Sequence, residues 1–120
     1  MSDKTSTKTW SEILNYYEDL VSQHGWEIVP MVSFASQMTS SSYAKAVYAY
    51  TSMATLCIGQ HRELEEENAL LRIEYQPKTK TADFTYKGDK ATEYTWTKSV
   101  DDSQIFTEFE RFLKELKWIG

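Results

Sequence analysis

The feature that most constrains the fold is an alternation of apolar and polar residues in the second half of the chain. Such alternation is typical of strands with one buried face. Turn-forming residues separate the alternating runs, at positions 77–80 and again at Gly88 and Asp89. Because short connections join antiparallel neighbours, the pattern predicts a three-stranded meander. The three runs are residues 69–76, 82–87 and 94–97.

An amphipathic helix is predicted before this meander, over residues 10–24. Apolar side chains recur there at steps of three and four residues, as one face of a helix requires. Thr9 and Glu12 have the spacing of a capping box, and Gly25 suits the left-handed position just past a helix.

A second amphipathic helix is predicted to close the chain. Asp101 and Asp102 can cap it and favour the positive end of its dipole. Its apolar stripe consists of Ile105, Phe109, Phe112, Leu113 and Leu116.

Residues 26–60 are harder to assign. The apolar, β-branched stretch 26–34 lies between Gly25 and a serine-rich loop, and it predicts a strand. Pro30 has no N–H to donate, so that strand should lie at an edge or carry a bulge. Residues 43–59 fit a helical period in part and a strand period in part, and neither period fits the whole segment. We predict a strand for residues 52–60 and leave residues 43–50 open.

These elements predict an α+β domain. The sheet is mostly antiparallel, with about four or five strands and a C-terminal meander, and the N- and C-terminal helices pack on one face. Residues 1–8 are polar and predicted to be flexible, and residues 9–120 are predicted to form a single domain.

Charge and composition restrict the classes of protein. The 18 Asp and Glu residues outnumber the 13 Lys and Arg residues, and the net charge of −5 makes nucleic acid an unlikely partner. No apolar run approaches the length of a membrane span, and the first residues lack the apolar stretch of a signal peptide, so no membrane partner is expected. A single cysteine, Cys57, fits a reducing compartment, so we expect a cytoplasmic protein.

Residues that could carry chemistry are few. Cys57 and His61 could form a nucleophilic or metal-binding pair, but on a strand they lie about 13 Å apart. His61 and the glutamates after it do not have the residue spacing of a metal-binding motif. His24 lies at the end of a predicted helix, and the sequence identifies no nucleophile or carboxylate that would act with it in catalysis. No catalytic residue, metal ligand or cofactor is therefore predicted. A small enzyme or metal-binding protein that uses His24, Cys57 or His61 is the alternative.

Aromatic residues of the meander offer a second alternative, because an aromatic sheet can stack single-stranded bases. The same alternation also explains these rings as core residues under two helices. They are Tyr75, Phe84, Tyr86, Tyr94 and Trp96.

The preferred interpretation is a small acidic, non-enzymatic protein-binding module. Four glutamates within five positions repel one another, and a positively charged partner would relieve that repulsion. In this interpretation, the chain is an inhibitor or immunity (antitoxin-like) protein that neutralises a basic partner such as a nuclease toxin. The predicted contact residues are Glu63, Glu65, Glu66, Glu67, Asp83, Asp89 and Glu93.

In size and charge the chain resembles bacterial immunity or antitoxin proteins and phage-encoded inhibitors. That resemblance covers no motif and implies no residue roles.

Overall fold

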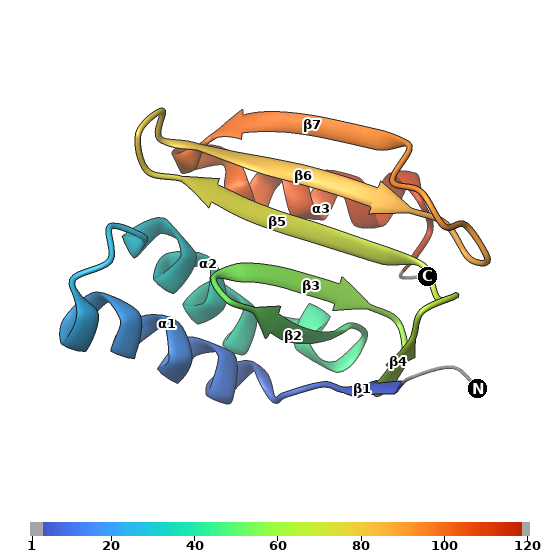
Figure 1. Cartoon of the computed structure of the whole chain (residues 1–120), viewed down its shortest axis with the longest axis horizontal. Coiled ribbons are helices and arrows are strands. Elements are labelled where there is room, and N and C mark those ends of the chain that lie inside the picture. Colours follow the sequence, from blue (N-terminus) through green and yellow to red (C-terminus); the bar gives the residue numbers. More distant parts are fainter. Residues whose placement is uncertain (1–3, 119–120) are drawn as a thin grey trace.

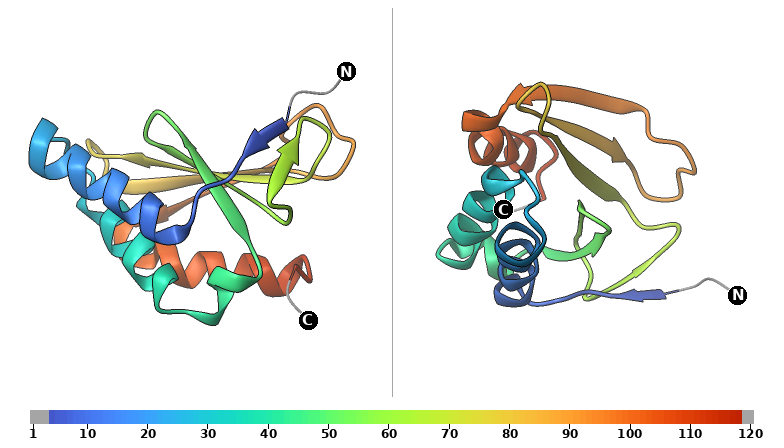
Figure 2. Two further views of the ribbon diagram at one scale, coloured as in Figure 1. Left: turned by 90° about the horizontal axis from the view of Figure 1, so that it is seen from below. Right: turned by 60° about the vertical axis from the view of Figure 1, so that its left-hand side comes forward.

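The computed structural model describes residues 4–118, in which a five-stranded antiparallel sheet carries three α-helices on one face (Figures 1 and 2). The strand order is β2-β3-β5-β6-β7, and β4 leaves this sheet to pair with β1. The α+β fold and its C-terminal meander are therefore as predicted. The strands of the main sheet are β2 (Tyr48–Ser52), β3 (Thr55–Gly59), β5 (Leu70–Gln76), β6 (Thr81–Lys87) and β7 (Trp96–Asp101).

The first helix, α1 (Trp10–His24), confirms its predicted bounds and its capping box. The Thr9 hydroxyl accepts from the Glu12 N–H at 3.1 Å, and the Glu12 carboxylate accepts from the Thr9 N–H at 3.0 Å. At the other end, Gly25 has a φ of 68°, the left-handed conformation that glycine adopts most readily.

The predicted strand over residues 26–34 is wrong, because this stretch enters the helix α2 (Val29–Thr39). Pro30 lies in the first turn of α2, where its missing N–H costs nothing. Four apolar side chains then follow at helical spacing and are buried. These are Met31, Phe34, Ala35 and Met38.

Residues 43–60 contain both kinds of structure. A short 3-10 helix, Ser42–Lys45, comes first, and β2 and β3 then form a hairpin. Met53, in the turn of the hairpin, has a positive φ of 56°. The strand predicted over residues 52–60 is therefore β3, preceded by the end of β2 and the turn.

A small two-stranded sheet ties the N-terminal segment to the middle of the chain. Strand β1 (Lys4–Ser6) pairs antiparallel with β4 (Glu63–Glu65), so that Thr5 lies opposite Leu64. The sequence predicted that residues 1–8 are flexible. Strands of only three residues, such as β1 and β4, are too short to show an alternating pattern in the sequence. Residues 1–3 lie outside the described residues.

The closing helix, α3 (Ile105–Glu115), follows a 3-10 turn, Asp102–Gln104. The Asp101 side chain caps that turn by accepting from the Ser103 N–H at 3.0 Å. Most of the predicted stripe is buried, but Leu116 is 39% exposed, which corrects its assignment to the core. Because α3 ends at Glu115, Leu116 lies outside the helical face that meets the sheet.

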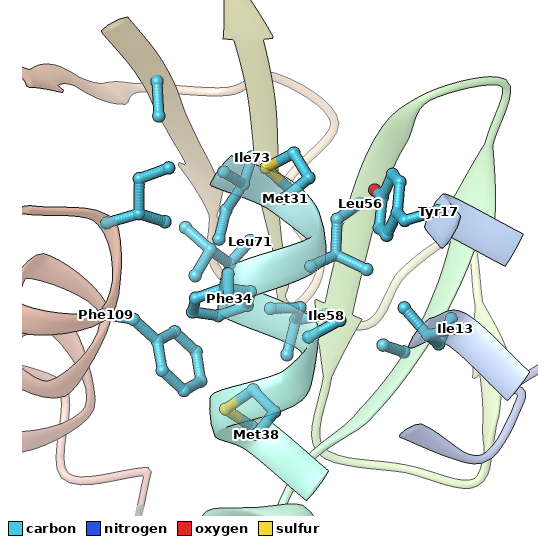
Figure 3. Close-up of a cluster of buried hydrophobic side chains, with 14 of the residues drawn as sticks. Ile13, Tyr17, Met31, Phe34, Met38, Leu56, Ile58, Leu71, Ile73 and Phe109 are labelled. Atoms are coloured by element: carbon cyan, nitrogen blue, oxygen red, sulfur yellow. The ribbon is translucent and has the colours of Figure 1, made fainter. Parts of the chain in front are cut away.

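Aromatic rings join the helices to each other above the sheet. The Phe34 ring of α2 makes an edge contact with the Phe109 ring of α3, with centroids 5.4 Å apart (Figure 3). It makes another edge contact with the Trp10 ring of α1, with centroids 6.3 Å apart. On the sheet below, the inward side chains of β3 and β5 are fully buried (Figure 3). They are Leu56, Ile58, Leu71 and Ile73.

Truncating the buried ring of α3 should therefore destabilise the fold. We expect Phe109→Ala to lower the free energy of unfolding by about 3–5 kcal/mol, because it removes apolar contacts and leaves a cavity. Leu116→Ala, the control on the exposed side, should change it by about 0.5 kcal/mol or less. Urea denaturation of both variants measures the difference, and equal losses would contradict the packing described here.

Candidate functional site

Six of the seven predicted contact residues lie at one end of the molecule, where β4 and the loop between β6 and β7 come together (Figure 1). The Lys90 N–H donates to the Glu67 carbonyl oxygen at 2.6 Å. The Asp89 carboxylate accepts from the Ala69 N–H at 2.8 Å. These bonds join the two acidic segments. We call this region the acidic corner, and it comprises Glu63, Glu65, Glu66, Glu67, Asp89 and Glu93.

A buried lysine fastens the acidic corner to the main sheet. Lys87, at the end of β6, is only 7% exposed. Its Nζ donates to the carbonyl oxygen of Glu66, and to that of Ala91 at 3.3 Å. The lysine therefore holds the turn after β4 and the β6–β7 loop through backbone oxygens.

A hollow of about 330 Å³ lies within the acidic corner. The tyrosine rings of Tyr50 and Tyr94 line it, and the Tyr94 side chain is 38% exposed. The Arg72 guanidinium lies 5.4 Å from the centre of the Tyr94 ring, a cation–π contact that orients the ring. The rest of its lining is Thr5, Leu64, Glu65, Glu66, Leu70 and Lys87.

The carboxylates of the acidic corner are close enough to influence one another. A hydrogen bond with Glu65, and next the repulsion between the two carboxyl groups, raise the pKa of Glu67 above its usual value. The nearby Lys90 opposes this shift. A further positive charge beside Glu67 would act in the same direction as Lys90.

Asp83, the seventh predicted residue, lies apart from the acidic corner. It points from the middle of β6 and accepts hydrogen bonds from Ser99 at 2.6 Å and Gln76 at 3.2 Å. Strand alternation shows the face on which Asp83 lies, but not its distance along the strand from the other acidic residues.

The three residues of the enzyme alternative do not come together. His24 is exposed at the end of α1, and His61 is exposed in the turn that follows β3. Cys57 is buried, and burial raises the pKa of its thiol despite hydrogen bonds from Tyr50 and Arg72. Burial likewise raises the pKa of Tyr50 to about 12. Within residues 4–118, no three His, Cys, Asp or Glu residues are placed to hold a metal ion.

The predicted base-stacking platform is not available in this fold. Phe84 is fully buried, and Tyr75, Tyr86 and Trp96 pack against the same core. Tyr86 and Trp96 contact the Phe112 ring of α3, with centroids 5.2 Å and 5.7 Å apart. Of the five rings, only Tyr94 lies outside this core, on the opposite face of the sheet.

Three residues of the site were missed by sequence reasoning. Tyr50, Arg72 and Lys87 come from β2, β5 and β6, and they meet only because of the strand order. The sequence signal that could have found two of them is strand alternation. It places Tyr50 and Arg72 on the other face of the sheet from their core-facing neighbours Ala49 and Leu71.

Comparison with known proteins identifies no relative: no family model, curated protein or solved structure matches the chain. None of the helices within residues 4–118 has the length and hydrophobicity of a transmembrane span.

Replacing the buried lysine should loosen the acidic corner. We expect Lys87→Met to lower the free energy of unfolding by about 1–3 kcal/mol, because two carbonyl oxygens lose a charged donor. Lys78→Met, at an exposed position, is the matched control. Hydrogen exchange should also quicken at the Ala69 and Lys90 amides. If Lys87→Met changes neither the free energy of unfolding nor the exchange of these amides, Lys87 does not hold the acidic corner in place.

Titration of the acidic corner offers a separate prediction. Glu67 should protonate at a higher pH than an ordinary glutamate, and Glu65→Gln should lower its pKa by removing the neighbouring negative charge. Glu63→Gln is the control, because Glu63 does not contribute to the shift. Carboxyl ¹³C shifts followed against pH measure the effect. A Glu67 pKa that Glu65→Gln leaves unchanged would contradict this account.

Proposed function

We propose that the protein is a small acidic, non-enzymatic protein-binding module that neutralises a basic protein partner, as inhibitors and immunity or antitoxin-like proteins do. The observation that supports this most is the acidic corner itself. Two of its six acidic residues, Glu65 and Glu66, line a hollow together with the rings of Tyr50 and Tyr94. Charged rims and aromatic anchors are the two components from which protein interfaces are commonly built.

The charges of the acidic corner would act first in binding. With a net charge of −5, the chain attracts positive surfaces at a distance, and the acidic corner concentrates that attraction at one end. Basic surfaces are common on proteins that act on nucleic acids, which makes a nuclease toxin a suitable partner.

The tyrosines would supply the short-range part of the interaction. Tyrosine contributes a large contact area and a hydroxyl group at a small cost in side-chain entropy. Tyr94 is exposed and already carries Arg72 against its ring, so its ring accepts guanidinium groups. A lysine or arginine of the partner in the hollow would meet the carboxylates of Glu65 and Glu66.

The properties of Cys57 fit a non-enzymatic protein of the cytoplasm. Its thiol is buried and its pKa is raised, so the reactive thiolate is scarce at neutral pH. A free cysteine is stable in a reducing compartment.

The acidic corner can be tested with two variants of equal charge. The first carries Glu63→Gln, Glu65→Gln, Glu66→Gln and Glu67→Gln. The control carries Glu18→Gln, Asp19→Asn, Glu27→Gln and Glu115→Gln, four exposed positions outside the acidic corner. The wild-type protein is used to capture its partner from the source organism, and mass spectrometry identifies that partner.

Binding of the purified partner is then measured at low and high salt. We expect the first variant to bind about tenfold or more weakly than the control at low salt, with a smaller difference at high salt. Both variants should keep the wild-type melting temperature within a few degrees. Equal affinities for the two variants, or an acidic partner, would contradict the proposal. So would a preparation that captures no protein and turns over a small molecule.

A further inference from the structure

A second cavity, with the opposite charge, lies where the chain passes from β1 into α1. It is open to solvent and has a volume of about 500 Å³, within the range of about 300–1,000 Å³ that is typical of small-molecule sites. Two basic side chains line it, Lys8 and Arg62. Among the described residues, no aspartate or glutamate lines it. The cavity therefore has a positive lining, although the chain has a net charge of −5.

Backbone hydrogen bonds fix both basic residues at the cavity. The Lys8 N–H donates to the Ala49 carbonyl oxygen of β2 at 2.8 Å. The N–H and the hydroxyl of Thr7 donate to the Arg62 carbonyl oxygen at 3.1 Å and 2.6 Å. The backbones that carry the two side chains are therefore held in place by these hydrogen bonds. This limits the conformational entropy that is lost when a ligand binds.

Neither basic side chain is neutralised by an ion pair within residues 4–118. Lys8 acts electrostatically on Glu12, but the Glu12 carboxylate already accepts from the Thr9 N–H at 3.0 Å. The capping box thus occupies the end of α1 with its own residues. The anion-binding groups of this cavity are the two side chains and not the helix end.

Hydroxyl groups and aromatic rings complete the cavity. The rings are those of Trp10, whose Nε1 donates to the Val47 carbonyl oxygen at 3.3 Å, and of Tyr48. The hydroxyls belong to Thr7, Thr9, Ser11 and Thr39. The Thr7 hydroxyl already donates to the Arg62 carbonyl oxygen, and the Thr39 hydroxyl donates to the Ser36 carbonyl oxygen at 2.7 Å. The hydroxyls of Thr9 and Ser11 can therefore donate to a ligand, while the rings can contact a planar apolar group.

We propose that this cavity binds a phosphate monoester that carries an aromatic group. A phosphate monoester has a charge of about −1.5 to −2 at pH 7, which two cations match, and arginine binds phosphate oxygens through its planar fork. The hydroxyls of Thr9 and Ser11 would donate to the remaining oxygens, and the aromatic group would lie against Trp10 and Tyr48. This inference does not depend on the partner-binding function proposed above.

The probes are adenosine 5′-monophosphate, phenyl phosphate, adenosine and inorganic phosphate, titrated separately into ¹⁵N-labelled full-length protein. We expect both monoesters to shift the amides of residues 7–11, Tyr48 and Arg62 in a saturable manner. Inorganic phosphate should bind more weakly at the same residues, and adenosine should cause no saturable shift there. The inference is overturned if neither monoester binds at millimolar concentration, or if adenosine binds as tightly as its monophosphate.

Two matched variants separate the basic residues from general charge effects. Lys8→Gln with Arg62→Gln should weaken binding of the monoesters about tenfold or more, because charged donors are lost. Lys78→Gln with Lys114→Gln removes two exposed charges elsewhere and should leave the affinity within about twofold. Equal weakening by both pairs would overturn the assignment. The exposed side chains of Lys8 and Arg62 make normal folding expected, and thermal denaturation checks it.

Discussion

Both faces of strand β3 are buried, and this two-sided burial connects the core to the acidic corner. On one face, Leu56 and Ile58 meet the helices, and on the other, Cys57 packs with Leu64 and Leu70. At the end of β3, the Leu64 side chain fills the space that a Cβ atom at Gly59 would need. A short, polar strand such as β4 has little stability of its own. Packing of Leu64 against the sheet therefore fixes the position of β4 and of the glutamates next to Leu64.

Two charged side chains are buried among the described residues, Lys87 and Glu108, and they are satisfied in different ways. Glu108 of α3 is paired with Lys98 at 2.9 Å and Arg111 at 3.3 Å, so its carboxylate is occupied by cations of the same chain. Lys87 instead donates to two backbone carbonyl oxygens. Because carbonyl oxygens carry the interaction, Lys87 holds the acidic corner together without using the Glu66 carboxylate. The Glu66 carboxylate thereby takes no part in this contact.

The parts of the fold that follow from local patterns could be predicted, and those that depend on distant contacts could not. The capping box of α1 and the alternation of β5 and β6 are readable within a few residues. Residues 26–34 show no clear period. Their run of apolar residues fits a buried strand as well as it fits a helix that is buried on most of its surface. The pairing of β1 with β4 joins segments almost sixty residues apart, for which no local signal exists. For the same reason, the sequence indicated the glutamates of the site but not Tyr50 or Lys87.

The segment that was expected to be flexible is the one that separates the two cavities. Thr5, in β1, lines the hollow of the acidic corner, and Thr7, two residues later, lines the basic cavity. The hydrogen bonds of Thr7 and Lys8 to Arg62 and Ala49 anchor this segment to the turn before β4 and to β2. Arg62 lines the basic cavity, and the acidic corner begins at the next residue, Glu63. The short β1–β4 pair thus keeps a positive and a negative site apart over a distance that flexible side chains could otherwise bridge.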